Sequence, residues 1–148
     1  MAETDEILLD WAWKNIDDLW DDKRELDNKG SILLTANGIV LGFLANSFDK
    51  LYYSLALLGL FLLVISIILC IVLLKPHSYT RSICEHHTEM CKLSKEQLNR
   101  KLYNELKDGY QKNMITILSL LKWYKWAINF FLLALLFIAF SIVVPYLF

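Results

Sequence analysis

Two long stretches without a charged residue constrain the fold of this chain more than any other feature. The first runs from Leu51 to Leu74 and the second from Trp126 to Phe148. The hydrocarbon core of a bilayer is roughly 30 Å thick, and a helix needs about 20 apolar residues to cross it. In lipid only helices and closed barrels satisfy every backbone polar group. We therefore predict that each stretch is a transmembrane helix.

A third uncharged stretch, residues 31–48, is shorter and more polar. It carries Thr35, Asn37 and Asn46 among its apolar residues. Its length still falls within the range that spans a bilayer, so we predict a first span here. The sequence thus predicts an all-α membrane protein with spans over residues 31–48, 51–74 and 126–148.

Charges in the connecting segments predict the orientation. Residues 75–125 contain ten Lys or Arg and five Asp or Glu, whereas the connection between the first two spans offers only Asp49 and Lys50. The positive-inside rule places residues 75–125 in the cytoplasm. The first two spans form a hairpin, so the N-terminus is predicted on the same side and the C-terminus outside. Aromatic residues would mark the outer interface (Tyr52, Tyr53, Tyr146) and the inner one (Trp123, Tyr124, Trp126).

Residues 1–30 show the pattern of an amphipathic cytoplasmic helix. Its polar face is acidic, and the anionic inner leaflet would repel it. We therefore expect its apolar residues to pack on protein, either on the cytoplasmic helix of the same chain or on a neighbouring subunit. Residues 1–30 show neither a basic start nor a small-residue cleavage site, so we expect the segment to remain in the mature protein. The apolar positions at helical spacing are Leu8, Leu9, Ala12, Trp13, Ile16, Leu19, Trp20 and Leu26.

A long helix is predicted to follow the cytoplasmic linker. Ser94 and Gln97 have the spacing of a capping box, which marks a helix start. From there a single helix is predicted to continue into the last span, about 80 Å long at 1.5 Å per residue. Apolar positions at spacings of three and four support it: Leu98, Leu102, Leu106, Tyr110, Met114, Ile117 and Leu121.

Small and polar residues share the first span. Small residues let membrane helices approach closely, and Gly38 with Gly42 forms a GxxxG pair. A buried amide in hydrocarbon needs a partner helix or water, and Asn129 in the last span is predicted at a depth comparable to that of Asn37. Two interpretations remain open, a packing face or a pore lining. The residues concerned are Thr35, Asn37, Gly38, Gly42, Ala45 and Asn129.

The cytoplasmic segment contains candidate ligands for ions. Its cations can bind phosphates or lipid head groups, or their excess can reflect topology alone. The cations are Arg81, Lys92, Lys95, Arg100, Lys101, Lys107 and Lys112. The first five of these are the candidate ligand-binding residues. A zinc site is an alternative for Cys84, His86, His87 and Cys91, but their spacing matches no common finger. We expect no metal and no cofactor. No catalytic motif occurs, so we do not expect an enzyme.

Two short motifs resemble a known family. The string "DNKGSILLTANG" opens the first span, with Asp27, Lys29, Gly30, Leu33, Leu34, Asn37 and Gly38 at its characteristic positions. A basic aromatic stretch precedes the last span, formed by Lys122, Trp123, Tyr124, Lys125 and Trp126. This layout resembles the small transmembrane effectors of prokaryotic nucleotide-signalled antiviral systems, namely the Pycsar effector type and the related SLATT group.

The resemblance implies an oligomeric inner-membrane effector of antiviral defence. A cyclic or oligonucleotide second messenger, made on infection, would trigger it to open or disrupt the membrane; its partners would be further copies of itself, the bilayer and the messenger, with no nucleic acid polymer. The chain departs from the family in its acidic, Trp-rich start and in lacking a recognisable sensor domain, which leaves any messenger site to the cytoplasmic helices. The alternative is a non-conducting anchor that recruits a cytosolic partner. A transporter is less favoured, because no ionisable side chain lies deep in a span.

Overall fold

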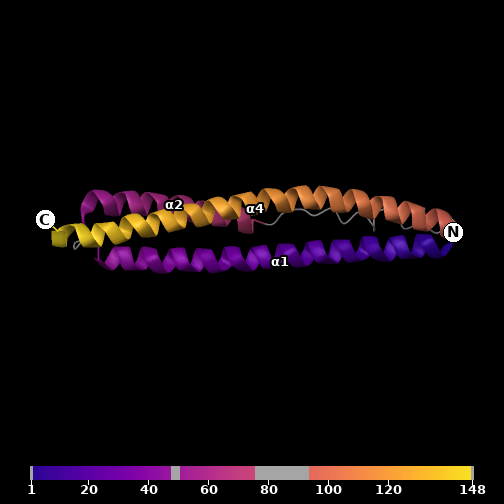
Figure 1. The fold of residues 1–148 in the computed structure, drawn as a ribbon, viewed down its shortest axis with the longest axis horizontal. Coiled ribbons are helices and arrows are strands. Elements are labelled where there is room, and N and C mark those ends of the chain that lie inside the picture. Colours follow the sequence, from indigo (N-terminus) through magenta and orange to yellow (C-terminus); the bar gives the residue numbers. More distant parts are fainter. Residues whose placement is uncertain (1, 48–50, 76–93, 148) are drawn as a thin grey trace. The chain divides into compact units, whose positions relative to one another are not determined.

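The computed structural model describes residues 2–47, 51–75 and 94–147, which are almost entirely helical (Figure 1). Helix α1 spans Ala2–Ser47, α2 spans Tyr53–Leu74 and α4 spans Lys95–Leu147. These ranges contain no strand. Each helix includes a stretch that is long and apolar enough to cross a membrane. The predicted all-α membrane fold with three spanning helices is confirmed.

Both long helices are continuous across the boundaries predicted from charge. α1 passes through residue 30 without a break, and α4 passes through residue 125. The predicted start of α4 is also found, because the Ser94 hydroxyl accepts a hydrogen bond from the Gln97 amide at 3.4 Å. The Gln97 side chain accepts one in return from the Ser94 amide at 3.3 Å. This reciprocal pair is the capping box that the sequence predicts.

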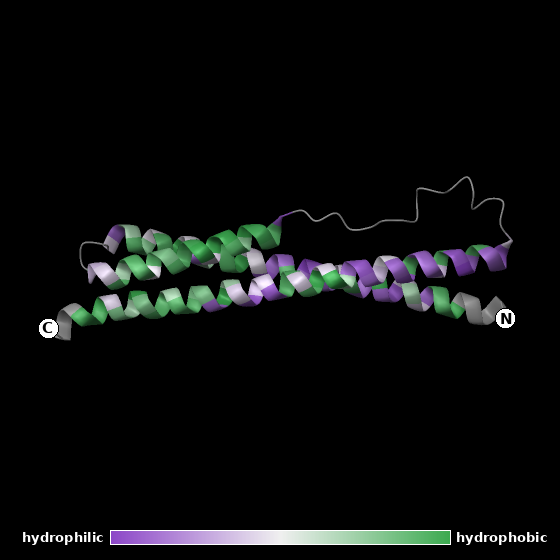
Figure 2. Ribbon diagram, turned by 90° about the horizontal axis from the view of Figure 1, so that it is seen from above, coloured by the Kyte–Doolittle hydropathy of each residue, from purple (hydrophilic) through white to green (hydrophobic). Residues whose placement is uncertain are grey.

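The chain divides into two compact units, which we call unit 1 and unit 2. Unit 1 comprises Met1–Glu25 and His77–Ser119, and unit 2 comprises Leu26–Pro76 and Leu120–Phe148. Hydrophobic residues dominate α2 and the parts of α1 and α4 that belong to unit 2, whereas hydrophilic residues are frequent in unit 1 (Figure 2). Unit 2 therefore contains the stretches suited to lipid.

Unit 2 is a bundle of three helices packed in layers. Each layer takes at least one buried residue from each helix, such as Leu26, Leu73 and Leu120. The residue numbers rise together along α1 and α4 and fall along α2, so α1 and α4 are parallel and α2 is antiparallel to both. The next layers contain Leu33, Cys70 and Ala127, and then Leu44, Leu63, Ala134 and Ile138.

Small residues bring α2 close to its neighbours. A Cβ atom added at Gly59 would lie 2.8 Å from Cγ1 of Ile138 and 3.3 Å from the backbone oxygen of Ala134. One added at Gly30 would lie 2.6 Å from Cδ2 of Leu73. At Gly59 the backbone of α4 is among the nearest atoms, so this glycine limits how closely α2 and α4 could approach with a larger residue, whereas at Gly30 the near atoms belong to leucine side chains. Small side chains at helix contacts are the usual means of close packing in membranes.

In unit 1, α1 packs on α4 through only part of its apolar surface. Ala12 and Leu19 are buried, as are Leu106 and Ile117. Two other apolar positions of the predicted helix, Trp13 and Trp20, each expose about 40% of their surface. Heptad spacing explains which apolar residues of α1 are buried, because Ala12, Leu19 and the buried Leu26 of unit 2 recur every seven residues.

The buried face of α4 differs in its central part from the apolar positions that predict the helix. Met114 and Leu121 of that pattern are exposed, whereas Asn113 and Leu120 are buried. The heptad that starts at Leu106 continues through Asn113 to Leu120. The buried face thus follows the heptad rather than the largest apolar side chains.

Candidate functional site

A chain of hydrogen bonds links all three helices in the interior of unit 2. The Asn37 side-chain NH2 donates to the backbone oxygen of Leu33 at 2.8 Å and to the Ser66 hydroxyl at 3.1 Å. Ser66 in turn donates to the backbone oxygen of Ala127 at 2.9 Å. Asn37, Ser66 and Ala127 are fully buried. We call this arrangement the Asn37–Ser66–Ala127 link.

One atom of the link has no partner. The Asn37 side-chain oxygen is buried and accepts no hydrogen bond from any described residue. Leaving a polar atom unpaired in an apolar interior costs about 1–3 kcal/mol, which offsets much of what the two donated bonds contribute. The link therefore specifies which faces meet, and it adds little net stability.

Because of this balance, Ser66→Ala is expected to destabilise unit 2 more than Asn37→Leu. The alanine leaves the buried Asn37 amide without its interhelical partner, which should cost about 1 kcal/mol. The leucine removes the whole amide, including the unpaired oxygen, and should be close to neutral. Unfolding of the purified protein by SDS in mixed micelles measures both. A larger loss for Asn37→Leu would contradict the hydrogen-bond assignment.

The small residues of the first span form an exposed face. Thr35, Gly38, Gly42 and Ala45 are all exposed. A Cβ atom added at Gly38 or Gly42 would meet nothing within 4 Å. The Thr35 hydroxyl donates to the backbone oxygen of Ser31 within the same helix at 3.0 Å. This open small-residue face is separate from the buried face that carries Asn37.

The remaining predicted site residues are dispersed. Asn129 is exposed, and the partner of Asn37 is Ser66 rather than Asn129. Arg100 is exposed and lies 3.6 Å from Glu96, an exposed ion pair of small energetic value. Lys95 is exposed and Lys101 is half-buried. The other predicted residues lie outside those described, namely Arg81 and Lys92 among the cations and Cys84, His86, His87 and Cys91 of the alternative zinc site.

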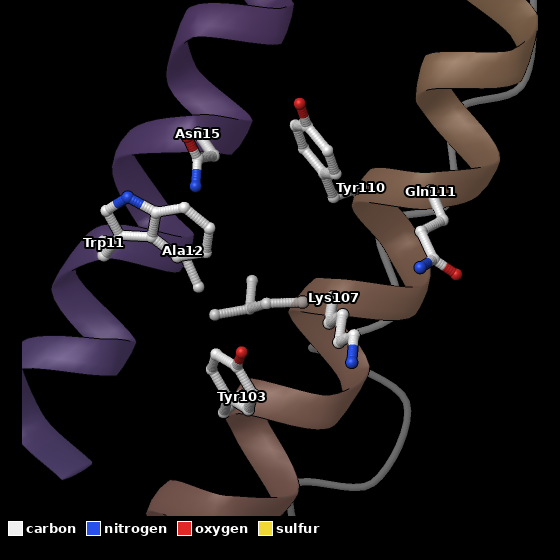
Figure 3. A pocket seen from close by; sticks show the side chains of 8 residues that line it. Trp11, Ala12, Asn15, Tyr103, Lys107, Tyr110 and Gln111 are labelled. Carbon is white, nitrogen blue, oxygen red and sulfur yellow. The ribbon is translucent and has the colours of Figure 1, made fainter.

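Unit 1 contains a pocket between α1 and α4. Its volume is about 290 Å³. Figure 3 shows Trp11 and Asn15 of α1 and Tyr103 and Tyr110 of α4 extending into the space between the helices, with the ends of Lys107 and Gln111 on the α4 side. Ala12 and Leu106 complete the lining. Among the described candidate cations, Lys95, Arg100 and Lys101 do not line this pocket.

A family model decides what kind of protein this fold belongs to. The model that describes the Pycsar effector protein domain matches residues 11–146. The chain belongs to this family. Its members are membrane effectors of anti-phage defence, and the family is not a known enzyme family. No curated protein and no solved structure matches the chain.

The motifs that suggested a Pycsar effector fall on both surfaces of unit 2. From the first motif, Gly30, Leu33 and Asn37 are buried in the bundle, whereas Gly38 is exposed. In the second motif Tyr124 is half-buried against the core and its neighbours Trp123 and Trp126 are exposed. One set of motif residues therefore packs the bundle of this Pycsar effector domain, and another is presented to its surroundings.

Sequence reasoning missed Ser66 and the pocket of this Pycsar effector. Ser66 was identifiable in principle, because it is spaced with Ala56, Gly59 and Cys70 at intervals of three, four and seven. The sequence contained a weaker indication of the pocket. Lys107 was among the wider set of cytoplasmic cations. Nothing in the sequence indicated that Trp11 lines a pocket together with two tyrosines that follow it by 92 residues or more.

Proposed function

We propose that this Pycsar effector assembles into homo-oligomers in the inner membrane and opens or disrupts the bilayer when a nucleotide second messenger triggers it. The open small-residue face of α1 carries the proposal. It is shaped for close approach of another helix, and no described residue of the same chain covers it. In lipid, close packing of such faces drives helix association.

The packing inside unit 2 supports the proposal that several copies must assemble before ions can pass through the membrane. Buried side chains of α1, α2 and α4 pack together in layers in the described part of unit 2. In our proposal, a path for ions therefore forms between copies or by separation of the helices. In the proposed active assembly, Thr35 and Asn129 line or border that path.

Asn37 gives this assembly a means of switching. Its unpaired oxygen is poorly satisfied in the packed bundle, and it would gain water or a new donor when the helices separate. A trigger shifts such an equilibrium only by its differential affinity for the two arrangements. The penalty at Asn37 reduces the free energy that the trigger has to supply.

We further propose that the N-terminus and residues 75–125 face the cytoplasm and that the C-terminus is extracytoplasmic. The excess of Lys and Arg over residues 75–125 supports this orientation. Exposed Tyr52 and Tyr53 at the start of α2, and exposed Trp123 and Trp126 on α4, suit the two membrane interfaces.

Dye release from liposomes tests the effector function. Purified protein in liposomes is expected to release dye, with a rate that rises on addition of the messenger. Asn37→Leu is expected to keep the fold and to lower the release rate several-fold, because the leucine gains nothing from separation of the helices. Asn28→Leu, the same exchange at an exposed position of α1 outside the predicted span, serves as the control.

The outcome also separates the effector from the anchor alternative. An anchor that recruits a cytosolic partner has one supporting observation, the exposed Trp13 and Trp20 on the acidic helix. It predicts no dye release under any condition, together with full activity when an unrelated membrane anchor replaces unit 2. Release that is equal in Asn37→Leu and parent protein would remove the proposed role of Asn37.

A further inference from the structure

The start of α2 is capped by another helix and not by a side chain of its own. The first N–H groups of a helix have no acceptor within that helix, and a side chain at the N-cap usually accepts from one of them. Tyr52 is the N-cap residue of α2, and its side chain makes no capping hydrogen bond. The Tyr52 N–H donates to the backbone oxygen of Ser141 on α4 at 3.0 Å. α4 thus supplies an acceptor at the point where α2 begins.

A proline explains why the Ser141 oxygen can accept this hydrogen bond. In an α-helix each carbonyl accepts from the N–H group four residues later. For Ser141 that residue is Pro145, which belongs to α4 and has no N–H. The Ser141 oxygen therefore lacks its regular donor within α4. A proline inside a helix costs stability partly through this lost hydrogen bond, and here the Tyr52 N–H replaces the missing donor.

The surroundings of Ser141 increase the importance of this hydrogen bond. Ser141 is fully buried, and a buried carbonyl without a donor is costly in apolar surroundings. Its hydroxyl donates to the backbone oxygen of Ile138 at 2.7 Å, and Ile138 in turn lies against Gly59 of α2. Among the described residues, the hydrogen bond from Tyr52 to Ser141 is the one backbone–backbone bond that joins two helices. It fastens α2 to α4 at the end of unit 2 where α2 begins.

We infer that Pro145 creates a backbone latch, the hydrogen bond from the Tyr52 N–H to the Ser141 oxygen, which holds α2 on α4 in the resting bundle and breaks when the helices separate. Pro145 acts through the Ser141 carbonyl, so it is a positioning residue. The role of the latch in switching rests on the proposed function, because it assigns one of the contacts that opening has to break. A contact that exists in one arrangement and not in the other shifts the equilibrium between them.

Hydrogen exchange of the full-length protein in detergent micelles tests the latch itself. Pro145→Ala supplies an N–H at position 145, which competes with the Tyr52 N–H for the Ser141 oxygen. The Tyr52 amide is expected to exchange at least about fivefold faster in this variant, the size expected when one hydrogen bond is lost. Val143→Ala is the control, because Val143 is exposed on α4 and the exchange leaves every backbone donor in place. Its Tyr52 amide should exchange as in the parent.

A second variant removes the donor in place of freeing a competitor. Tyr52 has a φ angle of −68°, which is the angle that proline imposes, so Tyr52→Pro removes the N–H while keeping the backbone conformation. In liposomes without messenger, Pro145→Ala and Tyr52→Pro should each raise the rate of dye release by at least about fivefold. Ser54→Pro places a proline in the same first turn of α2, where proline is tolerated, and should release dye like the parent.

The double variant distinguishes the latch from two unrelated perturbations. Because both exchanges remove the same hydrogen bond, Tyr52→Pro combined with Pro145→Ala should release dye no faster than the faster single variant. A rate equal to the product of the two single effects would overturn the inference. Equal exchange of the Tyr52 amide in Pro145→Ala and Val143→Ala would overturn it as well. Circular dichroism establishes that each variant remains helical.

The two measurements also separate the latch from the proposed function, since hydrogen exchange in detergent needs no membrane opening. Faster exchange of the Tyr52 amide in Pro145→Ala, with no dye release from any variant, would retain the latch and reject the effector mechanism. Release that the messenger stimulates, with a resting rate that neither Pro145→Ala nor Tyr52→Pro raises, would retain the mechanism and reject the latch as its switch.

Discussion

Replacing Gly59 by valine is expected to destabilise the three-helix bundle of unit 2 by about 3 kcal/mol. Any side chain at this position meets α4 at once, since a Cβ atom would lie 2.8 Å from Cγ1 of Ile138. In an open site the Ile138 side chain could rotate away, but here it is buried in the same layer as Leu63 and Ala134.

The backbone makes the clash at Gly59 hard to relieve. The same Cβ atom would lie 3.3 Å from the backbone oxygen of Ala134, which can move only if α4 moves as a whole. Separation of α2 from α4 also lengthens the hydrogen bond from Ser66 to the Ala127 oxygen, which is 2.9 Å in the native bundle. Overpacking therefore affects both the apolar layers and the Asn37–Ser66–Ala127 link.

Gly38→Val is the matched control for Gly59→Val. Both exchanges place a valine in a helix within a predicted span, so the change in helix propensity is the same. At Gly38 the new side chain meets nothing within 4 Å in its own chain. SDS titration of the monomeric protein in mixed micelles, followed by circular dichroism, gives the free energy of unfolding. Equal losses at the two positions would contradict the packing seen around Gly59.

Gly42→Ile is expected to abolish assembly while the fold of each chain remains intact. The added side chain projects from the open small-residue face and holds another helix away from α1. Association that depends on close backbone approach then loses most of its packing energy. Static light scattering after size-exclusion chromatography in detergent should show a single chain, and dye release should fall at least about tenfold, the size of a 1.4 kcal/mol effect.

Ala139→Ile controls for added bulk on an exposed part of a spanning helix. Ala139 is exposed on α4 and is not part of the small-residue face, so this variant should assemble and release dye like the parent. The SDS unfolding curve of Gly42→Ile should match that of the parent monomer. An unchanged mass for Gly42→Ile in detergent would contradict the assignment of this face to contacts between copies.

The presence of three spanning helices was predictable from sequence for a simple physical reason. A run without charge, such as 51–74, has no stable place in water at that length, and a helix is the structure that satisfies its backbone in lipid. The start of α4 was predictable too, because Ser94 and Gln97 satisfy local backbone donors whatever the rest of the chain does. The family was recognisable from the motif residues around Asn37.

The interior faces of these helices were much less predictable. In a span, both the lipid-facing and the protein-facing sides are apolar, so periodicity alone does not distinguish them. On α4, the apolar pattern includes Met114, which is exposed, whereas the polar Asn113 is buried. Only contact between helices selected the heptad positions.

The sequence by itself determined the number of apolar helices and the capping of the long one, because these depend on each segment's own charge and hydrogen bonding. The tertiary structure decided which of several similar residues are buried at helix contacts and which are exposed. Gly59 is closed against α4 while Gly38 is open, and Asn37 pairs with Ser66 rather than with Asn129. Those distinctions depend on which helices are neighbours and in what register, which is a property of the packed bundle and not of any one segment.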